Sequence, residues 1–201
     1  MNTLKTKLLM AVVLSLMFVG CSSDNVAVPH YVIPTTNDKP FTFLKVGNKW
    51  EYAKYNEQLQ YAGYFTQKIV SENAGYYKLE YDNGNQEYWY DGDECWKVKM
   101  YYSTIGGEIQ LYKNCYVEQK WSNYYMSGGY GFEDRIEVIS VSEVVSTFAG
   151  TFTNCIQLQV ETYIEGDQFC HIECYWLHKN IGLIKSKNYR GITTVLHKKN
   201  F

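Results

Sequence analysis

Proline is scarce in this chain and is confined to one part of it. Pro29, Pro34 and Pro40 are the only three prolines, and none follows in the rest of the sequence. Because a proline cannot donate a backbone hydrogen bond, it is excluded from central β-strands. The sequence after residue 40 can therefore form uninterrupted strand ladders. Residues 21–40 are polar, spaced by the prolines and without hydrophobic periodicity, which predicts a semi-extended tether.

The chain also lacks an excess of charge of either sign. It carries 19 basic and 21 acidic residues, which gives a formal net charge of −2, and the basic residues form no cluster. Because a nucleic-acid-binding surface needs a basic patch, we expect no nucleic-acid partner. No segment shows the 3.6-residue hydrophobic repeat of an amphipathic helix, which argues against a helical domain.

Motifs of catalysis are missing as well. The four histidines are scattered, and none stands in a Ser–His–Asp or Cys–His arrangement with local support. The acidic turns at residues 82–85 and 91–94 lack the spacing of an EF-hand loop. Residues 170–174 (CHIEC) would point to alternate faces of a strand and cannot supply four zinc ligands. We therefore expect a non-enzymatic protein without metal or cofactor, while paired carboxylates that meet only in three dimensions stay open.

The N-terminus has the pattern of a secretory leader. Lys5 and Lys7 precede an apolar run over residues 8–19, which is too short for a membrane span. The run ends in Phe-Val-Gly directly before Cys21, which is similar to the lipobox of bacterial lipoproteins. We interpret residues 1–20 as a lipoprotein signal peptide that is cleaved before Cys21.

Cys21 is therefore the predicted lipid anchor. Several acyl chains at this residue would hold the mature protein stably on a membrane, whereas a single chain binds only marginally. Ser22 follows at the position where an aspartate would retain a lipoprotein in the inner membrane. The sequence thus predicts an outer-membrane lipoprotein of the cell envelope, and it leaves open whether the protein faces the periplasm or the outside.

Residues 41–201 have the pattern of one antiparallel β domain. Stretches of alternating apolar and polar residues are separated by turn sequences such as residues 82–85 (DNGN), which is typical of a tight hairpin. Short connections favour an up-and-down meander over Greek-key crossings. We expect an all-β fold with a single antiparallel meander curled into a half-barrel or lipocalin-like barrel, with a sandwich as the alternative. The expected strands cover residues 49–53, 64–71, 76–81, 86–90, 95–102, 108–117, 135–141, 155–164, 169–177, 181–189 and 192–197.

Three segments of this domain carry a further pattern: Phe43–Tyr52 (FLKVGNKWEY), Phe148–Ile156 (FAGTFTNCI) and Ile181–Lys185 (IGLIK). In order and spacing they are similar to a broad group of uncharacterised envelope lipoproteins of the Bacteroidota. The resemblance implies an all-β fold and a lipid anchor, but it supplies no activity and no site residues. The residues of these segments that would share a strand face, and are expected in the core, are Trp50, Tyr52, Phe148 and Phe152.

Residues 120–133 form a long irregular stretch that is rich in Tyr, Ser and Gly. We expect this segment to be a loop that crosses one open end of the sheet. Rigid aromatic rings on a Gly- and Ser-rich backbone give many binding surfaces their contact area at a low entropic cost. The alternative is that the rings fold back and plug the end of the barrel. The predicted ligand-binding residues are Trp121, Tyr124, Tyr125, Tyr130 and Phe132.

Two functions fit such a domain. A binding module for an apolar molecule or a glycan should contain a pocket of roughly a few hundred Å³ lined by aromatic side chains. A structural or interaction component of an envelope protein complex should instead have a filled interior and a contiguous exposed apolar patch. The expected partners are thus the membrane, through acyl chains on Cys21, and a glycan, a lipid or an envelope protein.

The cysteines other than Cys21 allow a disulfide. Five of the six remain for this purpose, and an envelope compartment permits the bond. The odd number leaves at least one thiol unpaired. A hairpin centred on Ile105 would place Cys95 directly opposite Cys115, which makes this pair the candidate disulfide. Two buried thiols are the alternative.

Overall fold

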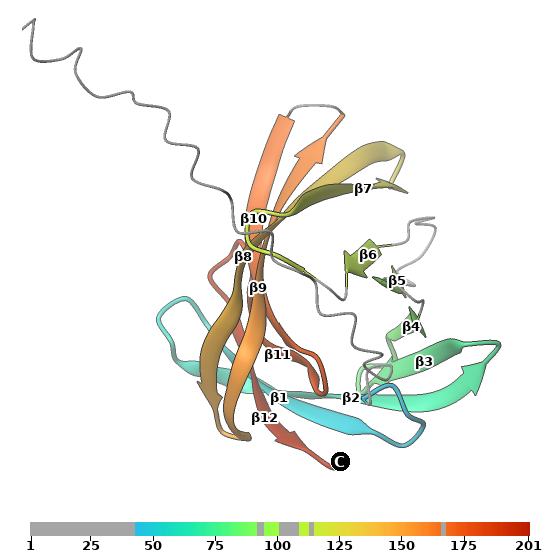
Figure 1. Cartoon of the computed structure of the whole chain (residues 1–201), viewed down its shortest axis with the longest axis vertical. Helices are drawn as coiled ribbons and strands as arrows, with labels where there is room; N and C mark the ends of the chain where they lie inside the picture. Colours follow the sequence, from blue (N-terminus) through green and yellow to red (C-terminus); the bar gives the residue numbers. More distant parts are fainter. Residues whose placement is uncertain (1–42, 92–94, 101–108, 113–114, 166–167) are drawn as a thin grey trace, which may run out of the picture. The chain divides into compact units, whose positions relative to one another are not determined.

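The computed structural model describes residues 43–91, 95–100, 109–112, 115–165 and 168–201. These residues contain twelve β-strands, and they include no helix that could cross a membrane. All neighbouring strands pair antiparallel in one curled sheet that does not close (Figure 1). The predicted all-β fold is confirmed in its half-barrel form. The strands are β1 (Lys49–Tyr55), β2 (Tyr61–Asn73), β3 (Tyr76–Tyr81), β4 (Gln86–Asp91), β5 (Cys95–Met100), β6 (Ile109–Tyr112), β7 (Lys120–Ser127), β8 (Tyr130–Thr147), β9 (Gly150–Ile164), β10 (Gln168–His178), β11 (Gly182–Lys187) and β12 (Thr193–Lys199).

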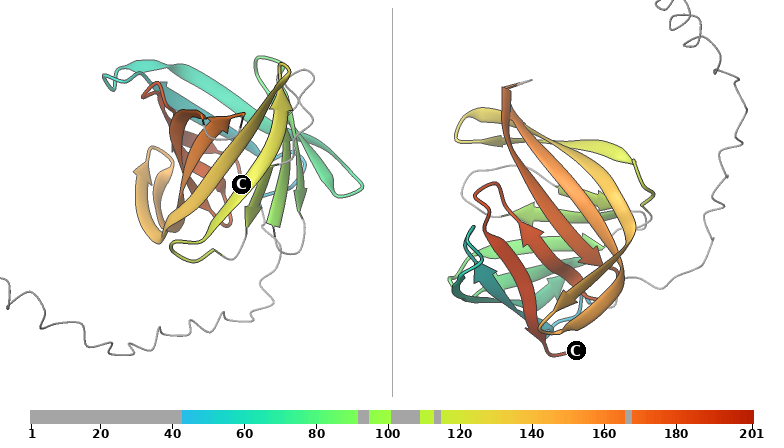
Figure 2. Two further views of the ribbon diagram at one scale, coloured as in Figure 1. Left: turned by 90° about the horizontal axis from the view of Figure 1, so that it is seen from above. Right: turned by 90° about the vertical axis from the view of Figure 1, so that its left-hand side faces the viewer.

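The sheet consists of two six-stranded meanders that the first and last strands join. Its order is β6-β5-β4-β3-β2-β1-β12-β11-β10-β9-β8-β7, so all neighbours are consecutive in sequence except the central pair β1–β12. That pair runs from Trp50 opposite Lys199 to Tyr55 opposite Thr193. β6 and β7 are the two edges, and no ladder joins them within the described residues. Figure 2 shows the two meanders curving toward one another, which brings side chains of both onto one concave face.

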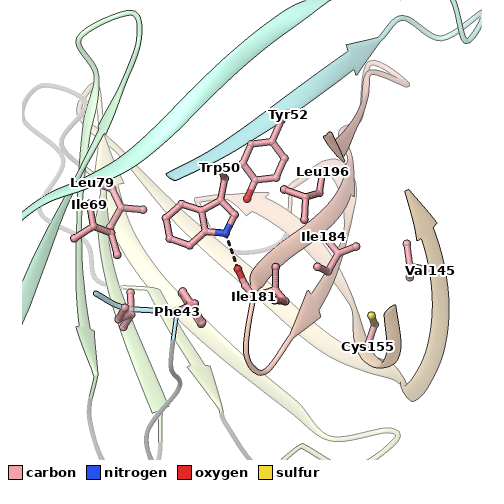
Figure 3. Packing of buried hydrophobic residues seen from close by; sticks show 11 residues of the cluster. Phe43, Trp50, Tyr52, Ile69, Leu79, Val145, Cys155, Ile181, Ile184 and Leu196 are labelled. Carbon is pink, nitrogen blue, oxygen red and sulfur yellow. Dashed lines mark hydrogen bonds between the residues drawn. The ribbon is translucent and has the colours of Figure 1, made fainter. Parts of the chain in front are cut away.

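Trp50 and Tyr52 of β1 form hydrogen bonds across the interior with backbone carbonyl groups at the start of β11. The β11–β12 ladder begins at Lys185, so the carbonyl groups of residues before Lys185 do not take part in it. The Trp50 indole Nε1 donates to the Ile181 carbonyl at 2.7 Å (Figure 3), and the Tyr52 hydroxyl donates to the Leu183 carbonyl at 3.1 Å. The two residues are only 2% and 1% exposed. Their predicted place in the core is confirmed.

The β8–β9 hairpin is much longer than the sequence pattern predicted, with 18 residues in β8 and 15 in β9. Between Val138 and Val145 the pairing register shifts three times. Such β-bulges disrupt the ladder and bend the strands, which explains why a simple alternation is lost there. Beyond the bend, Val145 and Cys155 lie in the same buried cluster as Ile184 and Leu196 (Figure 3). The part of the hairpin between the bend and the turn therefore contributes to the core.

The prediction that Phe148 lies in the core is wrong. The chain turns at Phe148 and Ala149, at the tip of the β8–β9 hairpin, and Phe148 is 66% exposed. Phe152 lies in β9 and packs against the buried cluster. The two phenylalanines do not share a strand face because a turn separates them.

Residues 120–133 form a β-hairpin and not the predicted loop. β7 pairs with the start of β8 along its whole length. Gly128 and Gly129, with φ of 59° and 88°, make the turn between the two strands. A Gly-Gly pair is a hairpin signal, because both residues adopt positive φ without strain. The prediction failed because β7 (KWSNYYMS) lacks a regular alternation of apolar and polar residues and has the Tyr- and Ser-rich composition of a loop.

The β5–β6 ladder places Cys95 opposite Tyr112 and not opposite Cys115. The expected direct opposition of the two cysteines is therefore wrong. The observed register also pairs Val98 with Ile109. The Cys95 side chain lies outside the described side chains, so the disulfide itself stays a prediction, now without the geometric argument that supported it.

Candidate functional site

A cavity of about 220 Å³ lies on the concave face of the sheet. Residues of β1–β4 line it on one side, and residues of β8–β11 line it on the other. An apolar cavity of about 150 Å³ is already large enough to bind benzene. The aromatic side chains of the lining are Phe43, Trp50, Tyr52, Tyr81, Trp89 and Tyr175, and its aliphatic ones are Leu79, Ile136, Leu158, Val160, Leu177 and Leu183.

Strand alternation brings two carboxyl groups into this lining. In β4, Glu87 and Trp89 are two residues apart and both line the cavity. In β8, Asp134 and Ile136 have the same relation. Side chains two residues apart in a strand point to the same face, so each acid shares its face with an aromatic or aliphatic neighbour.

Glu87 is 4% exposed and is held by two donors. The Tyr81 hydroxyl donates to one carboxyl oxygen, and the Trp89 indole Nε1 donates to the other at 3.1 Å. Burial raises the pKa of Glu87, because the charged form loses its water, while the two hydrogen bonds act in the opposite direction. The net effect is a raised pKa in an apolar wall.

Asp134 is 7% exposed and lies in the other half of the sheet. Its Oδ1 accepts hydrogen bonds from the Thr162 hydroxyl at 2.7 Å and from the Tyr125 hydroxyl at 3.4 Å. Burial raises the pKa of Asp134, and the two hydrogen bonds and the charge of His171 oppose that shift. The cavity therefore has one buried carboxyl group on each side.

Tyr175 lines the cavity and is affected by the charges of the acids on both sides. Its hydroxyl donates to Glu173. Burial raises the pKa of Tyr175 well above its ordinary value, and the charges of Glu173, Asp134 and Glu87 raise it further. Among the described residues of the lining there is no lysine or arginine. The charged groups of the described lining are thus acidic, Gln67 adds a neutral amide, and most of the remaining lining is apolar.

The described part of the chain contains no cluster of potential metal ligands. No three His, Cys, Asp or Glu side chains there come together as a group of ligands. Cys170 is exposed, whereas the neighbouring Cys174 is half-buried.

The five predicted ligand-binding residues all lie on the β7–β8 hairpin, and none lines the cavity. Tyr124 and Tyr130 are 71% and 56% exposed. Tyr125 and Phe132 stack on each other, with ring centroids 5.4 Å apart, and Trp121 packs against the buried cluster around Ile136. Two of the five nevertheless contact the cavity lining, because Tyr125 donates a hydrogen bond to Asp134 and Trp121 packs against the cluster that contains Ile136. A role of these residues in binding stays a prediction.

Glu87 and Asp134 are the site residues that sequence reasoning missed. A signal for them was present, because each stands in phase with apolar residues of its own strand. Trp89 follows Glu87 at the same face, and Ile136 and Val138 follow Asp134. An acidic residue at an inward position of a strand is expensive to bury and is therefore informative.

A second feature is a row of aromatic rings outside the cavity lining. Tyr55, Tyr61 and Tyr64 follow one another with ring centroids 6.2 and 4.9 Å apart. The row continues from Tyr64 to His197 at 4.8 Å and from His197 to Phe148 at 5.3 Å. Tyr61, Tyr64 and Phe148 are each at least half exposed. We call these five residues the outer aromatic row.

Solved structures with a similar fold include two proteins of the Bacteroidales. One is a Bacteroides fragilis protein described as exported and as having a YmcC-like fold; it is 14% identical, with a TM-score of 0.55 over 78% of this chain and 97% of that chain. The other is a Parabacteroides distasonis protein described as a lipoprotein, with 14% identity and a TM-score of 0.51 over 79% and 99% of the two chains. At this identity the likeness shows the fold alone.

The Escherichia coli lipoprotein YmcC is more distant, with 6% identity and a TM-score of 0.41 over 78% of this chain and 86% of that chain. No protein-family model matches the chain, and a search of curated proteins finds no match either.

Proposed function

We propose that this protein is an outer-membrane lipoprotein whose half-barrel binds a small, mostly apolar ligand in the cavity between its two meanders. The observation that carries the proposal is a cavity of about 220 Å³ lined by six aromatic residues and two buried carboxyl groups. Protein interiors are close-packed and contain few voids larger than a water molecule. A domain with a purely structural role would be expected to fill this apolar space with its own side chains.

An apolar ligand fits the lining better than a glycan does. Each hydroxyl group of a sugar needs a hydrogen-bond partner when it leaves water. The polar groups of the lining are few, and Glu87 and Asp134 already accept hydrogen bonds from neighbouring side chains. The cavity therefore has little left to offer to several hydroxyl groups.

The envelope location rests on the leader sequence and on Cys21, which lie outside the described residues. Two of the proteins with a similar fold are described as exported or as a lipoprotein, which supports the same location for this chain. Replacing Cys21 with alanine should abolish incorporation of labelled palmitate and release the protein from the membrane fraction. Incorporation that survives the substitution would remove the anchor from the proposal.

A blocking substitution tests the cavity. The mature chain carrying Cys21→Ala, which needs no detergent, is titrated with propylbenzene while its tryptophan fluorescence is followed. Val160→Phe should fill the cavity and weaken binding by at least about tenfold, which corresponds to about 1.4 kcal/mol. Val144→Phe makes the same change at an exposed position and should leave binding as it was. Absence of propylbenzene binding to the parent chain would overturn the proposal.

The outer aromatic row favours a second function, docking of an envelope protein. Exposed rings that form a continuous patch mark interaction surfaces more often than isolated ones do. Replacing Tyr61 and Tyr64 with serine should then shift the protein to a smaller species in a native gel of solubilised envelopes. An unchanged size would speak against this second function without affecting the first.

A further inference from the structure

The aromatic end of the cavity has the composition of a cation-binding cage. Phe43 packs against two indoles in T-shaped geometry, with ring centroids 6.0 Å from Trp50 and 5.9 Å from Trp89 at interplanar angles of 79° and 81°. All three rings line the cavity. Aromatic faces carry negative electrostatic potential and attract ammonium groups, most strongly when water is excluded.

Glu87 places a carboxyl group in the same cage. The residue is bonded to Trp89, and both of its oxygens accept hydrogen bonds from donors of the wall. Two donors on one carboxyl group favour its charged form and offset part of the burial that raises its pKa. Within the described residues, the side chains that bond to Glu87 are Tyr81 and Trp89, and no lysine or arginine forms an ion pair with it.

The rest of the cavity adds negative charge and no fixed positive charge. Asp134 faces it from β8, and Glu173 lies beside Tyr175 on β10. Tyr52 of β1 and Tyr81 of β3 complete the titratable groups of the lining. Within the described part of the chain, His171 is the basic group whose charge affects these acids, and it lowers the pKa of Asp134. A carboxylate ligand would be repelled here, whereas an ammonium group would neutralise a buried charge.

We infer that the ligand of the proposed cavity is an amphipathic amine. Its apolar part fills the aliphatic side of the cavity, and its ammonium group pairs with Glu87 among the aromatic side chains of Phe43, Trp50 and Trp89. The inference rests on the proposed function and names the chemical class of its ligand. It also gives the buried Glu87 carboxylate the counter-charge that the described side chains do not supply.

The test compares two probes of equal shape. Phenethylammonium and propylbenzene differ in the replacement of a charged NH₃⁺ group by a methyl group. Both are titrated into the mature Cys21→Ala chain at about pH 8, where carboxyl groups are ionised unless strongly shifted. Phenethylammonium should bind at least about tenfold more tightly than propylbenzene.

Variants then assign the difference to Glu87. Glu87→Gln should weaken phenethylammonium binding by at least about tenfold and leave propylbenzene within about twofold. Glu161→Gln is the matched control, because Glu161 alternates with the lining residue Val160 on the opposite face of β9, and it should change neither affinity. Near-UV circular dichroism shows whether the variants keep their packing.

The wild-type chain provides a test that needs no substitution at the site. Phenethylammonium stays charged between about pH 5 and pH 8, so a loss of affinity on acidification reports protonation of the protein. We expect weaker ammonium binding at about pH 5 and unchanged propylbenzene binding. Equal affinity of both probes at both pH values would overturn the amine inference and leave the cavity proposal standing. Binding of neither probe would overturn both.

Discussion

At the scale of single residues, Glu87 and Trp50 show two ways in which this half-barrel handles buried polar groups. Glu87 keeps an acid in an apolar wall with the help of Tyr81 and Trp89. Trp50 uses its one donor to satisfy a backbone carbonyl that the β11–β12 ladder leaves aside. The first arrangement makes the free energy of unfolding depend on pH, and the second avoids the free-energy cost of an unpaired buried carbonyl group.

Glu87→Gln should flatten the pH dependence of stability. Burial raises the pKa of Glu87 above its ordinary 4.5, so between that value and the raised pKa the folded protein binds more protons than the unfolded chain. The stability contributed by the protonated group is fully present below the ordinary value and is lost as the pH rises through the raised pKa. Urea unfolding across this window should show a fall of at most about 1.4 kcal/mol per pH unit from this group in the wild type and a smaller fall in the variant.

Asp134→Asn should reduce the same slope independently, because burial raises the pKa of Asp134 as well. If both variants kept the wild-type slope, neither carboxyl group would be ionising in a buried place, and the acidic character assigned to the cavity would be wrong.

Trp50→Phe should destabilise the domain by about 1–3 kcal/mol, because the Ile181 carbonyl loses its donor in a buried place. Trp176→Phe is the control, since within the described residues the Trp176 indole N–H has no hydrogen-bond partner and the residue is only partly buried. The free energy of unfolding from urea titrations should separate the two variants. Equal losses would mean that ring size, and not the hydrogen bond, determines the effect.

At the scale of elements, the sequence predicted most strands and their turns but neither β7 nor the length of β8 and β9. Strands such as β1 and β3 were recognised because alternation and Gly or Asn turns coincide there. β7 was missed because its sequence (KWSNYYMS) shows no regular alternation of apolar and polar residues. The ends of the β8–β9 hairpin were missed because three register shifts interrupt the alternation that a sequence pattern depends on.

Glycines at positive φ allow a prediction on how elements approach each other. Gly182, at the start of β11, has a φ of 85°, and a Cβ there would lie 3.2 Å from the Phe43 ring. Gly84, in the β3–β4 turn, has a φ of 83° and open space around it. Gly84→Ala should cost about 1–2 kcal/mol for the backbone conformation alone. Gly182→Ala should cost more, because Phe43 must also move.

Thermal unfolding of the two glycine variants measures this difference directly. The Gly182→Ala protein should also show an altered tryptophan signal, because Phe43 contacts Trp50 and Trp89. Equal destabilisation without a spectral change would show that Phe43 yields freely.

At the scale of the whole molecule, the cavity could not be predicted because no single element contains it. Its two carboxyl groups lie on β4 and β8, in different meanders, and no ladder joins those strands. They face one cavity only because the sheet curls (Figure 2). The sequence therefore leaves paired carboxylates open and predicts a site in residues 120–133, whereas the structure presents the cavity as the candidate.

The central β1–β12 ladder brings the two ends of the domain together, which allows a circular permutation of the chain. The Asn200 side chain accepts a hydrogen bond from the Lys49 amide at 2.8 Å and donates to the Gly47 carbonyl at 3.1 Å, so both ends of the domain meet at one point. A circular permutant that joins Phe201 to Phe43 by a short linker and starts at β7 should fold, with a urea midpoint close to that of the parent. A permutant that stays unfolded would show that the order of synthesis matters. In the permuted order, every strand would follow its neighbour in the sheet, from one edge to the other. The natural sequence is therefore an up-and-down meander whose first strand lies in the middle of the sheet instead of at an edge.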